Sequence, residues 1–339
     1  GLLADAIRAA GSNLDDLLTL HRLDPAYRAR FADGSVLHVR HGHEAMRDEI
    51  ATNCGAADAA AFDDFVKWLK ALYEAELPNF IDANFDGPLD LLRRPSAAVR
   101  LLQLGAFARL GPAIERRFAD ERLHRMFSFQ AMYAGLAPAQ ALALYAVITY
   151  MDSIEGVWFP EGGMRAIGPA MAEAVTAAGG VVRCQSPVER VLRRSDGSVT
   201  GVRLVDGETI AADAVVLTPD LPLAYERLLD LPPPAVLRRR PKYSPSCVVW
   251  HAGVEGEPEP DAAHHTIHFG QEWQGAFDDL MQRGVLMRDP SRFVCRPSVH
   301  DASAAQAGRQ VLYVLEPVPN LADGELEWTR SARDAMRER

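Results

Sequence analysis

The most informative segment of the sequence is Gly156-Val157-Trp158-Phe159-Pro160-Glu161-Gly162-Gly163-Met164. Its apolar run Val157–Phe159 predicts a short strand, and the glycine pair opens an amphipathic helix from about Met164 to Ala178. Gly179-Gly180 closes that helix, and Val181–Cys184 predicts the next strand. This strand–helix–strand order is typical of an α/β fold.

Further strands are predicted downstream by short apolar runs between turn residues. They are Val188–Leu192, Val199–Leu204, Ala214–Leu217, Cys247–Ala252, Thr266–Phe269, Phe293–Arg296 and Val311–Leu315. With one short helix at Trp273–Met281, the last four predict an antiparallel α+β region. The fold class is therefore expected to be mixed, with α/β and α+β parts.

Two further patterns precede the segment 156–164. A hairpin is predicted over 25–40, where Asp33-Gly34 forms the turn. Residues 57–150 carry helical spacing, interrupted by prolines and glycines into short and medium helices. The region predicts a helical module inserted between strand-rich segments.

Composition excludes several classes of protein. The chain has 339 residues, 48% of them hydrophobic and 24% charged, which excludes intrinsic disorder for most of its length. A net charge of −10 argues against a nucleic-acid partner. The four cysteines are far apart and form no CxxC pair, which favours a reducing cytoplasmic compartment. No apolar run approaches the ~20 residues that span a bilayer.

Few sequence motifs carry chemistry by themselves. The chain has no GxGxxG, GxSxG or HExxH motif. The glycine pair Gly162-Gly163 lets a helix start approach a phosphate closely, and a plain strand-to-helix turn explains it equally well. Of the histidines in His264–His268, the first and last are expected on one strand face and His265 on the other. Two imidazoles are too few for a metal, so we expect no metal site.

Residues 89–118 are basic and rich in leucine, with six arginines against two acids. This composition favours a helix on an anionic membrane surface, or a core-facing helix with a solvated basic side. Within the segment, Asp90 and Arg93 are three residues apart among leucines. They could form a partly desolvated pair for proton transfer, or Asp90 could cap a helix while Arg93 is solvated.

Several blocks of the chain together resemble the bacterial phytoene desaturases, FAD-dependent enzymes of carotenoid synthesis. The blocks, in order, are Ser128–Gln130, Gly156–Met164, Gly179–Val191, Ala212–Val216, Ala263–Gly270, Arg296–Ser298 and Tyr313–Leu321. They follow the order of the family and cover essentially the whole chain. The family's dinucleotide motif and its C-terminal glycine-rich segment are absent from the sequence. The chain is therefore expected to be a central fragment that is inactive alone.

The resemblance implies a division of the chain and a cofactor site. FAD is the implied cofactor, with Gly162, Gly163 and the backbone of Val188 as binding residues. The implied segments are a helical edge of the FAD domain (1–24), substrate-domain strands (25–56), a helical membrane-facing subdomain (57–152), an FAD-domain segment (153–225), the rest of the substrate domain (226–325) and the start of a helix (326–339).

The resemblance also implies a reaction. Desaturation removes a hydride and a proton from neighbouring carbons, and the flavin carries the hydride step. Asp90 and Arg93 are the candidate catalytic residues for the proton. A hydrophobic polyene substrate comes from a membrane, which implies a cytoplasmic protein bound peripherally to one. A carotenoid isomerase, a ketolase and a non-catalytic lipid-binding escort are the alternatives. The oligomeric state stays open.

Overall fold

The structure is a computed structural model that describes residues 1–83, 94–235, 238 and 243–338. The chain divides into two compact units. The small unit consists of Gly1–Leu14 and Pro169–Tyr243, and the large unit consists of Asp15–Gly168 and Ser244–Arg339.

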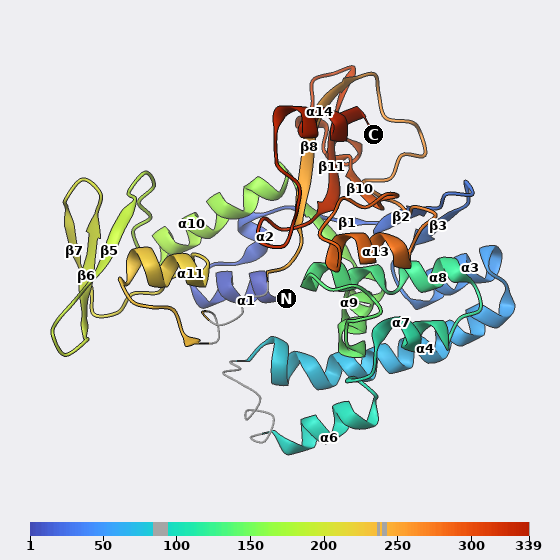
Figure 1. Cartoon of the computed structure of the whole chain (residues 1–339), viewed down its shortest axis with the longest axis horizontal. Helices are drawn as coiled ribbons and strands as arrows, with labels where there is room; N and C mark the ends of the chain where they lie inside the picture. Colours follow the sequence, from blue (N-terminus) through green and yellow to red (C-terminus); the bar gives the residue numbers. More distant parts are fainter. Residues whose placement is uncertain (84–93, 236–237, 239–242, 339) are drawn as a thin grey trace. The chain divides into compact units, whose positions relative to one another are not determined.

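The small unit contains a three-stranded antiparallel sheet in the order β5-β6-β7 (Figure 1). Its elements are α1 (Leu2–Ala9), most of α10 (Ile167–Ala177), β5 (Val188–Arg193), β6 (Val199–Leu204), β7 (Thr209–Ala211), α11 (Leu221–Leu223) and the π-helical turn η6 (Ala224–Leu228). The helix after the glycine pair and the strands at Val188 and Val199 are confirmed as predicted.

Two predicted strands of this unit are wrong. Val181–Cys184 and Ala214–Leu217 have no strand conformation. Val181 is 82% exposed and Val216 is 88% exposed, so neither apolar run is covered within the described chain. A β-branched run becomes a strand only when a neighbouring strand pairs with it, because propensity alone contributes little.

The large unit is built on a six-stranded sheet in the order β3-β2-β9-β10-β11-β8. Its strands are β2 (Tyr27–Arg30), β3 (Val36–Val39), β8 (Ser246–Glu255), β9 (His265–His268), β10 (Arg292–Cys295) and β11 (Arg309–Val318). The β2–β9 pair is parallel and the other four pairs are antiparallel. The predicted hairpin is confirmed as β2–β3, with Gly34 at a φ of 85° in its turn.

Helices make up the rest of the large unit, together with the two-stranded sheet β1 (Leu20–Leu23) and β4 (Val157–Pro160). The helices are α2 (Leu14–Leu17), α3 (His43–Asn53), α4 (Ala56–Glu76), α6 (Pro95–Gln103), α7 (Leu110–Glu115), α8 (Glu121–Met126), α9 (Val147–Tyr150), α13 (Gln274–Met281) and α14 (Arg330–Glu338). Short 3₁₀ or π-helical turns are η1 (Leu77–Ile81), η2 (Phe129–Ala134), η3 (Ala143–Ala146), η4 (Met151–Glu155), η5 (Met164–Ala166), η7 (Pro297–Val299) and η8 (Ala302–Ala304).

Aromatic side chains form the centre of the large unit's core. Phe62 and Phe65 of α4 are fully buried and lie 5.9 and 5.1 Å, between ring centroids, from Phe127. Phe118 meets Phe65 edge to face at 5.2 Å. This cluster continues to Tyr27 of β2 and to Phe269, directly after β9, so the helical module packs on the sheet through one hydrophobic core.

Candidate functional site

An apolar cavity of about 540 Å³ lies on one face of the six-stranded sheet. Side chains alternate along a strand, and the register places Phe293 of β10 between Ile267 of β9 and Leu315 of β11. The apolar side chains that line the cavity include Phe129, Met132, Ile267, Phe269, Trp273, Phe277, Met287, Phe293 and Leu315. The volume is in the range of small-molecule sites, roughly 300–1,000 Å³.

Helix α13 and the turn η2 supply the aromatic walls of the cavity. Trp273 meets Phe277 edge to face at 4.9 Å, and Phe269 lies 5.8 Å from both Trp273 and Phe129. These rings come from segments far apart in the sequence and hold one another in fixed orientations. The arrangement suits a hydrocarbon ligand and offers little to a polar one.

One charged side chain, that of Arg292, lies in the described lining of the cavity and is paired. Arg292 and Glu316 face each other across β10 and β11, with Nε and Oε2 2.7 Å apart. The Glu316 carboxylate is fully buried. Arg292 also lines the cavity, and its pairing with the buried Glu316 carboxylate compensates its positive charge there.

Asp152, in η4, is an acidic residue that interacts electrostatically with Tyr133 at the rim of the cavity. Burial raises its pKa from 3.8 to about 7, against the opposing effect of a hydrogen bond with the Gln130 side chain. Tyr133 lines the cavity and is 66% exposed, and its pKa is raised first by desolvation of its hydroxyl and then by the charge of Asp152. A carboxyl group that titrates near neutral pH can accept or release a proton. The only signal in the sequence is an acid directly after the apolar run Val147–Met151.

The glycine pair forms the predicted turn, and its backbone is used internally. Gly162 and Gly163 have φ values of 79° and 81°, which glycine adopts without strain. The Gly162 N–H donates to an Asp301 carboxylate oxygen at 3.0 Å, and the Gly163 N–H donates to the Pro160 carbonyl at 3.0 Å. A Cβ at Gly163 would meet nothing within 4 Å, so one side of the turn is open. Val188 begins β5 in the small unit and is 38% exposed.

The predicted catalytic pair cannot be placed. Asp90 and Arg93 lie outside the described residues. The next arginine, Arg94, donates to the backbone carbonyls of Pro78 and Asn79 at 2.9 and 2.7 Å. The pair therefore stays a prediction.

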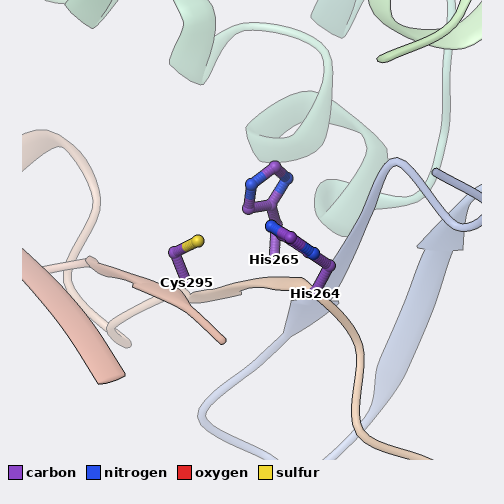
Figure 2. A group of neighbouring side chains, drawn as sticks. All are labelled: His264, His265 and Cys295. Carbon is purple, nitrogen blue, oxygen red and sulfur yellow. The ribbon is translucent and has the colours of Figure 1, made fainter. Parts of the chain in front are cut away.

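Two histidines and a cysteine come together at the end of β9 (Figure 2). One possible ligand atom from each of His264, His265 and Cys295 lies within 4.8 Å of the others. The expectation that His265 points away from His264 is wrong, since their ring centroids are 4.6 Å apart. The strand begins at His265, so strand alternation does not apply to His264. Cys295 could not be found from spacing, because it joins through the β9–β10 register.

Comparison with known proteins shows the family. Residues 5–309 match the family described as flavin containing amine oxidoreductase, and the chain belongs to that family. A Streptomyces griseus protein named phytoene dehydrogenase is 48% identical over 96% of this chain and 63% of its own length. A zeta-carotene-forming phytoene desaturase of Myxococcus xanthus is 36% identical over 96% of this chain and 62% of its own length.

The comparisons confirm three expectations, namely the resemblance to phytoene desaturases, a flavin-dependent oxidoreductase family with FAD as its cofactor, and a mixed fold. A solved structure from Pyrococcus furiosus matches all of this chain and 68% of its own, with a TM-score of 0.57 and 14% identity, which supports the fold alone. The chain spans less than two thirds of the length of the two curated relatives. Among the described residues, no helix is long and apolar enough to cross a membrane.

The first prediction concerns the pH dependence of stability. Because the folded-state pKa of Asp152 lies above its usual value, the folded state holds this proton while the unfolded state loses it. As the pH rises from about 4 to 7, the free energy of unfolding of the wild type should therefore fall relative to the free energy of unfolding of the Asp152→Asn variant. Above about pH 7 the difference should stay constant. Denaturant titration across this range measures it.

The matched control is Asp64→Asn, which changes an acid whose side chain is 83% exposed. It should follow the wild-type pH profile. Parallel profiles for Asp152→Asn and the wild type would contradict the assignment of a raised pKa to Asp152.

Proposed function

We propose that the protein catalyses the FAD-dependent desaturation of phytoene or a related C40 or C30 carotenoid precursor. The observation that carries this proposal is the apolar cavity of about 540 Å³ with its aromatic walls. A polyene precursor has no polar group, so a cavity of this composition suits it. The names of the two curated relatives support the same class of substrate.

Forming the new double bond takes a hydride from one carbon and a proton from its neighbour. When bound, FAD supplies the two-electron acceptor that no protein side chain can provide. The chain's own residues hold the hydrocarbon against the sheet and keep water from it. Phe293 and Leu315 form the floor, and Trp273 and Phe277 form a wall.

The proton needs an acceptor, and Asp152 is the candidate that the structure describes. Its raised pKa makes the carboxylate a stronger base than an ordinary aspartate, and its electrostatic coupling to Tyr133 relates it to the cavity rim. Asp90, with Arg93 to keep it ionised, is the alternative acceptor.

The turn at Gly162 and Gly163 is the proposed cofactor contact in the large unit. The open side at Gly163 fits a flavin lying against the backbone there, because any larger residue would place a Cβ in that space. The N–H groups of both glycines already have acceptors, so the proposed contact is one of close approach. Val188 is the proposed backbone contact in the small unit.

Helix α6 is the proposed contact with a membrane, from which an apolar substrate must come. Val99 and Leu102 are 50% and 64% exposed and lie on one side of the helix, while Leu101 is buried. Arg100 provides a positive charge beside them. These features support peripheral attachment of a cytoplasmic protein to an anionic surface.

The second prediction tests the function in cells that make phytoene. The full-length protein should convert phytoene into more unsaturated, coloured products. Leu315→Asn places an unpartnered amide in the cavity, which should weaken substrate binding by roughly 10–100-fold. The control, Val314→Asn, changes the neighbouring residue on the opposite face and should retain near-wild-type conversion. Carotenoid extraction and chromatography measure the products.

Four outcomes would contradict the proposal. Unchanged phytoene would favour the escort, and isomers with the same number of hydrogens would favour an isomerase. Oxygenated products would favour a ketolase. Equal loss in the Leu315 and Val314 variants would argue against the cavity as the substrate site.

The third prediction distinguishes the two proton acceptors. Replacing the base with Asn removes the carboxylate and should lower turnover by roughly 10²–10⁴-fold. We expect this for Asp152→Asn, with unchanged flavin content, and near-wild-type turnover for Asp90→Asn. The reverse pattern would assign the proton to Asp90, and full activity of both variants would exclude a carboxylate base.

The fourth prediction tests the membrane surface. The double variant Val99→Glu/Leu102→Glu should reduce binding of the full-length protein to anionic vesicles by at least about tenfold, because it removes two apolar contacts and adds repulsion. Ala57→Glu/Ala60→Glu adds the same charge at exposed positions of α4 and should bind as the wild type does. Equal binding of the two variants in co-sedimentation would contradict the assignment of α6.

A further inference from the structure

We propose that His264, His265 and Cys295 form a binding site for a borderline-soft transition-metal cation, with Zn²⁺ as the reference ion. The three residues each bring one ligand atom to within 4.8 Å of the other two. Figure 2 shows the sulfur of Cys295 directed toward the two imidazole rings. The site lies within the large unit and does not depend on the proposed function.

Strand pairing holds two of the ligands in place. His265 and Cys295 are directly opposite residues of β9 and β10. The ladder continues beyond them, since the Arg296 N–H donates to the His264 carbonyl at 2.7 Å. Directly opposite residues in an antiparallel pair have Cβ atoms roughly 4.5–5.5 Å apart, so their side chains can bind one ion.

The hydrogen bond of His265 fixes which nitrogen is free. Its Nδ1 lies 3.1 Å from the carbonyl oxygen of Ala26. A carbonyl only accepts, so Nδ1 carries the proton and Nε2 keeps its lone pair. Donation of the remote ring N–H to a backbone carbonyl is the usual support of a metal-binding histidine.

His264 presents a buried nitrogen that nothing else uses. The residue is fully buried, and its Nε2 has no hydrogen-bond partner among the described residues. Its other nitrogen, Nδ1, lies 3.3 Å from Nδ1 of His300. When His264 donates in this contact, Nε2 is left with a buried lone pair that has no hydrogen-bond partner among the described residues. A bound cation would satisfy it.

Binding of a cation would change the chemistry of Cys295. The cation would displace the thiol proton and stabilise the thiolate by direct contact.

The ligand set selects the kind of ion. Two imidazoles and a thiolate suit Zn²⁺, Co²⁺ or Cu⁺, whereas Mg²⁺ and Ca²⁺ require oxygen ligands. Tetrahedral zinc with bond lengths of about 2.0–2.3 Å brings its ligand atoms to roughly 3.3–3.7 Å from one another. Small side-chain rotations would close the present spacing. Three protein ligands would leave the fourth position for water.

The site would lie at the polar end of the cavity face. Tyr313 of β11, which lines the cavity, is directly opposite Cys295, and the His265 ring centroid lies 5.3 Å from Phe293. The cation would thus connect β9 to β10 where the apolar floor ends. It would order this end of the cavity.

The test measures Zn²⁺ bound by the full-length protein after chelator treatment, equilibration with equimolar Zn²⁺ and gel filtration. The wild type should retain about one equivalent by elemental analysis. Cys295→Ser should bind at least roughly 100-fold more weakly, since even loss of a ligand's supporting group costs about 10–100-fold. Cys184→Ser and His251→Asn, which change an exposed cysteine and a histidine two strands from β10, should bind as the wild type does.

Two further measurements keep the test decisive if Cys295→Ser fails to fold. Co²⁺ should give a thiolate-to-metal absorption band in the wild type. Addition of Cu⁺ should displace the Co²⁺ and abolish this band. Zn²⁺ should also protect Cys295, and no other cysteine, from alkylation as detected by mass spectrometry. Absence of retained Zn²⁺, binding unaffected by Cys295→Ser, or alkylation of Cys295 at the same rate with Zn²⁺ would each overturn the proposal.

Discussion

The pairing of β10 with β9 on one side and β11 on the other positions both the cavity floor and the cluster of His264, His265 and Cys295. It places Phe293 between Ile267 and Leu315, which makes the floor of the cavity, and Cys295 between His265 and Tyr313, which makes its polar end. A shift of one residue would move every one of these side chains to the opposite face. The same register aligns Arg292, which lines the cavity, with the buried Glu316 carboxylate, so the charge of the arginine is compensated.

The helical module packs against this sheet through a shared hydrophobic core. Phe62, Phe65 and Phe127 pack without exposure to solvent, and their cluster reaches the sheet through Tyr27 and Phe269. Phe269 belongs to both the core and the cavity wall. Changes in core packing are therefore expected to alter the cavity, because interiors packed at this density transmit displacements.

Local sequence patterns predicted the elements of the fold well where a neighbour existed to stabilise them. The hairpin at Asp33-Gly34, the helix after Gly162-Gly163 and the strands of the large sheet follow from turn residues and apolar runs. Val181–Cys184 has the same pattern and is not a strand, because no neighbouring strand pairs with it in the described chain. Propensity predicts a strand only together with its partner.

The functional groups were harder to predict, because each depends on contacts between distant segments. The cavity takes its lining from η2, α13 and four strands, and the resemblance to a family indicated a hydrophobic substrate without locating it. Asp152 looked ordinary in sequence, since its pKa depends on burial. His265 and Cys295 are thirty residues apart and meet only through strand register. Gly162 and Gly163 were predicted as a turn, and the acceptors of their N–H groups became clear only from the structure.

We propose that the cavity face of the six-stranded sheet holds the polyene. Photo-crosslinking of the full-length protein with a C40 polyene that carries a diazirine, followed by peptide mass spectrometry, tests this placement. Labels are expected on peptides from α13 and β11, particularly at Phe277 and Leu315, and unlabelled phytoene should suppress them. Labels confined to the small unit, or labels that phytoene does not suppress, would contradict it.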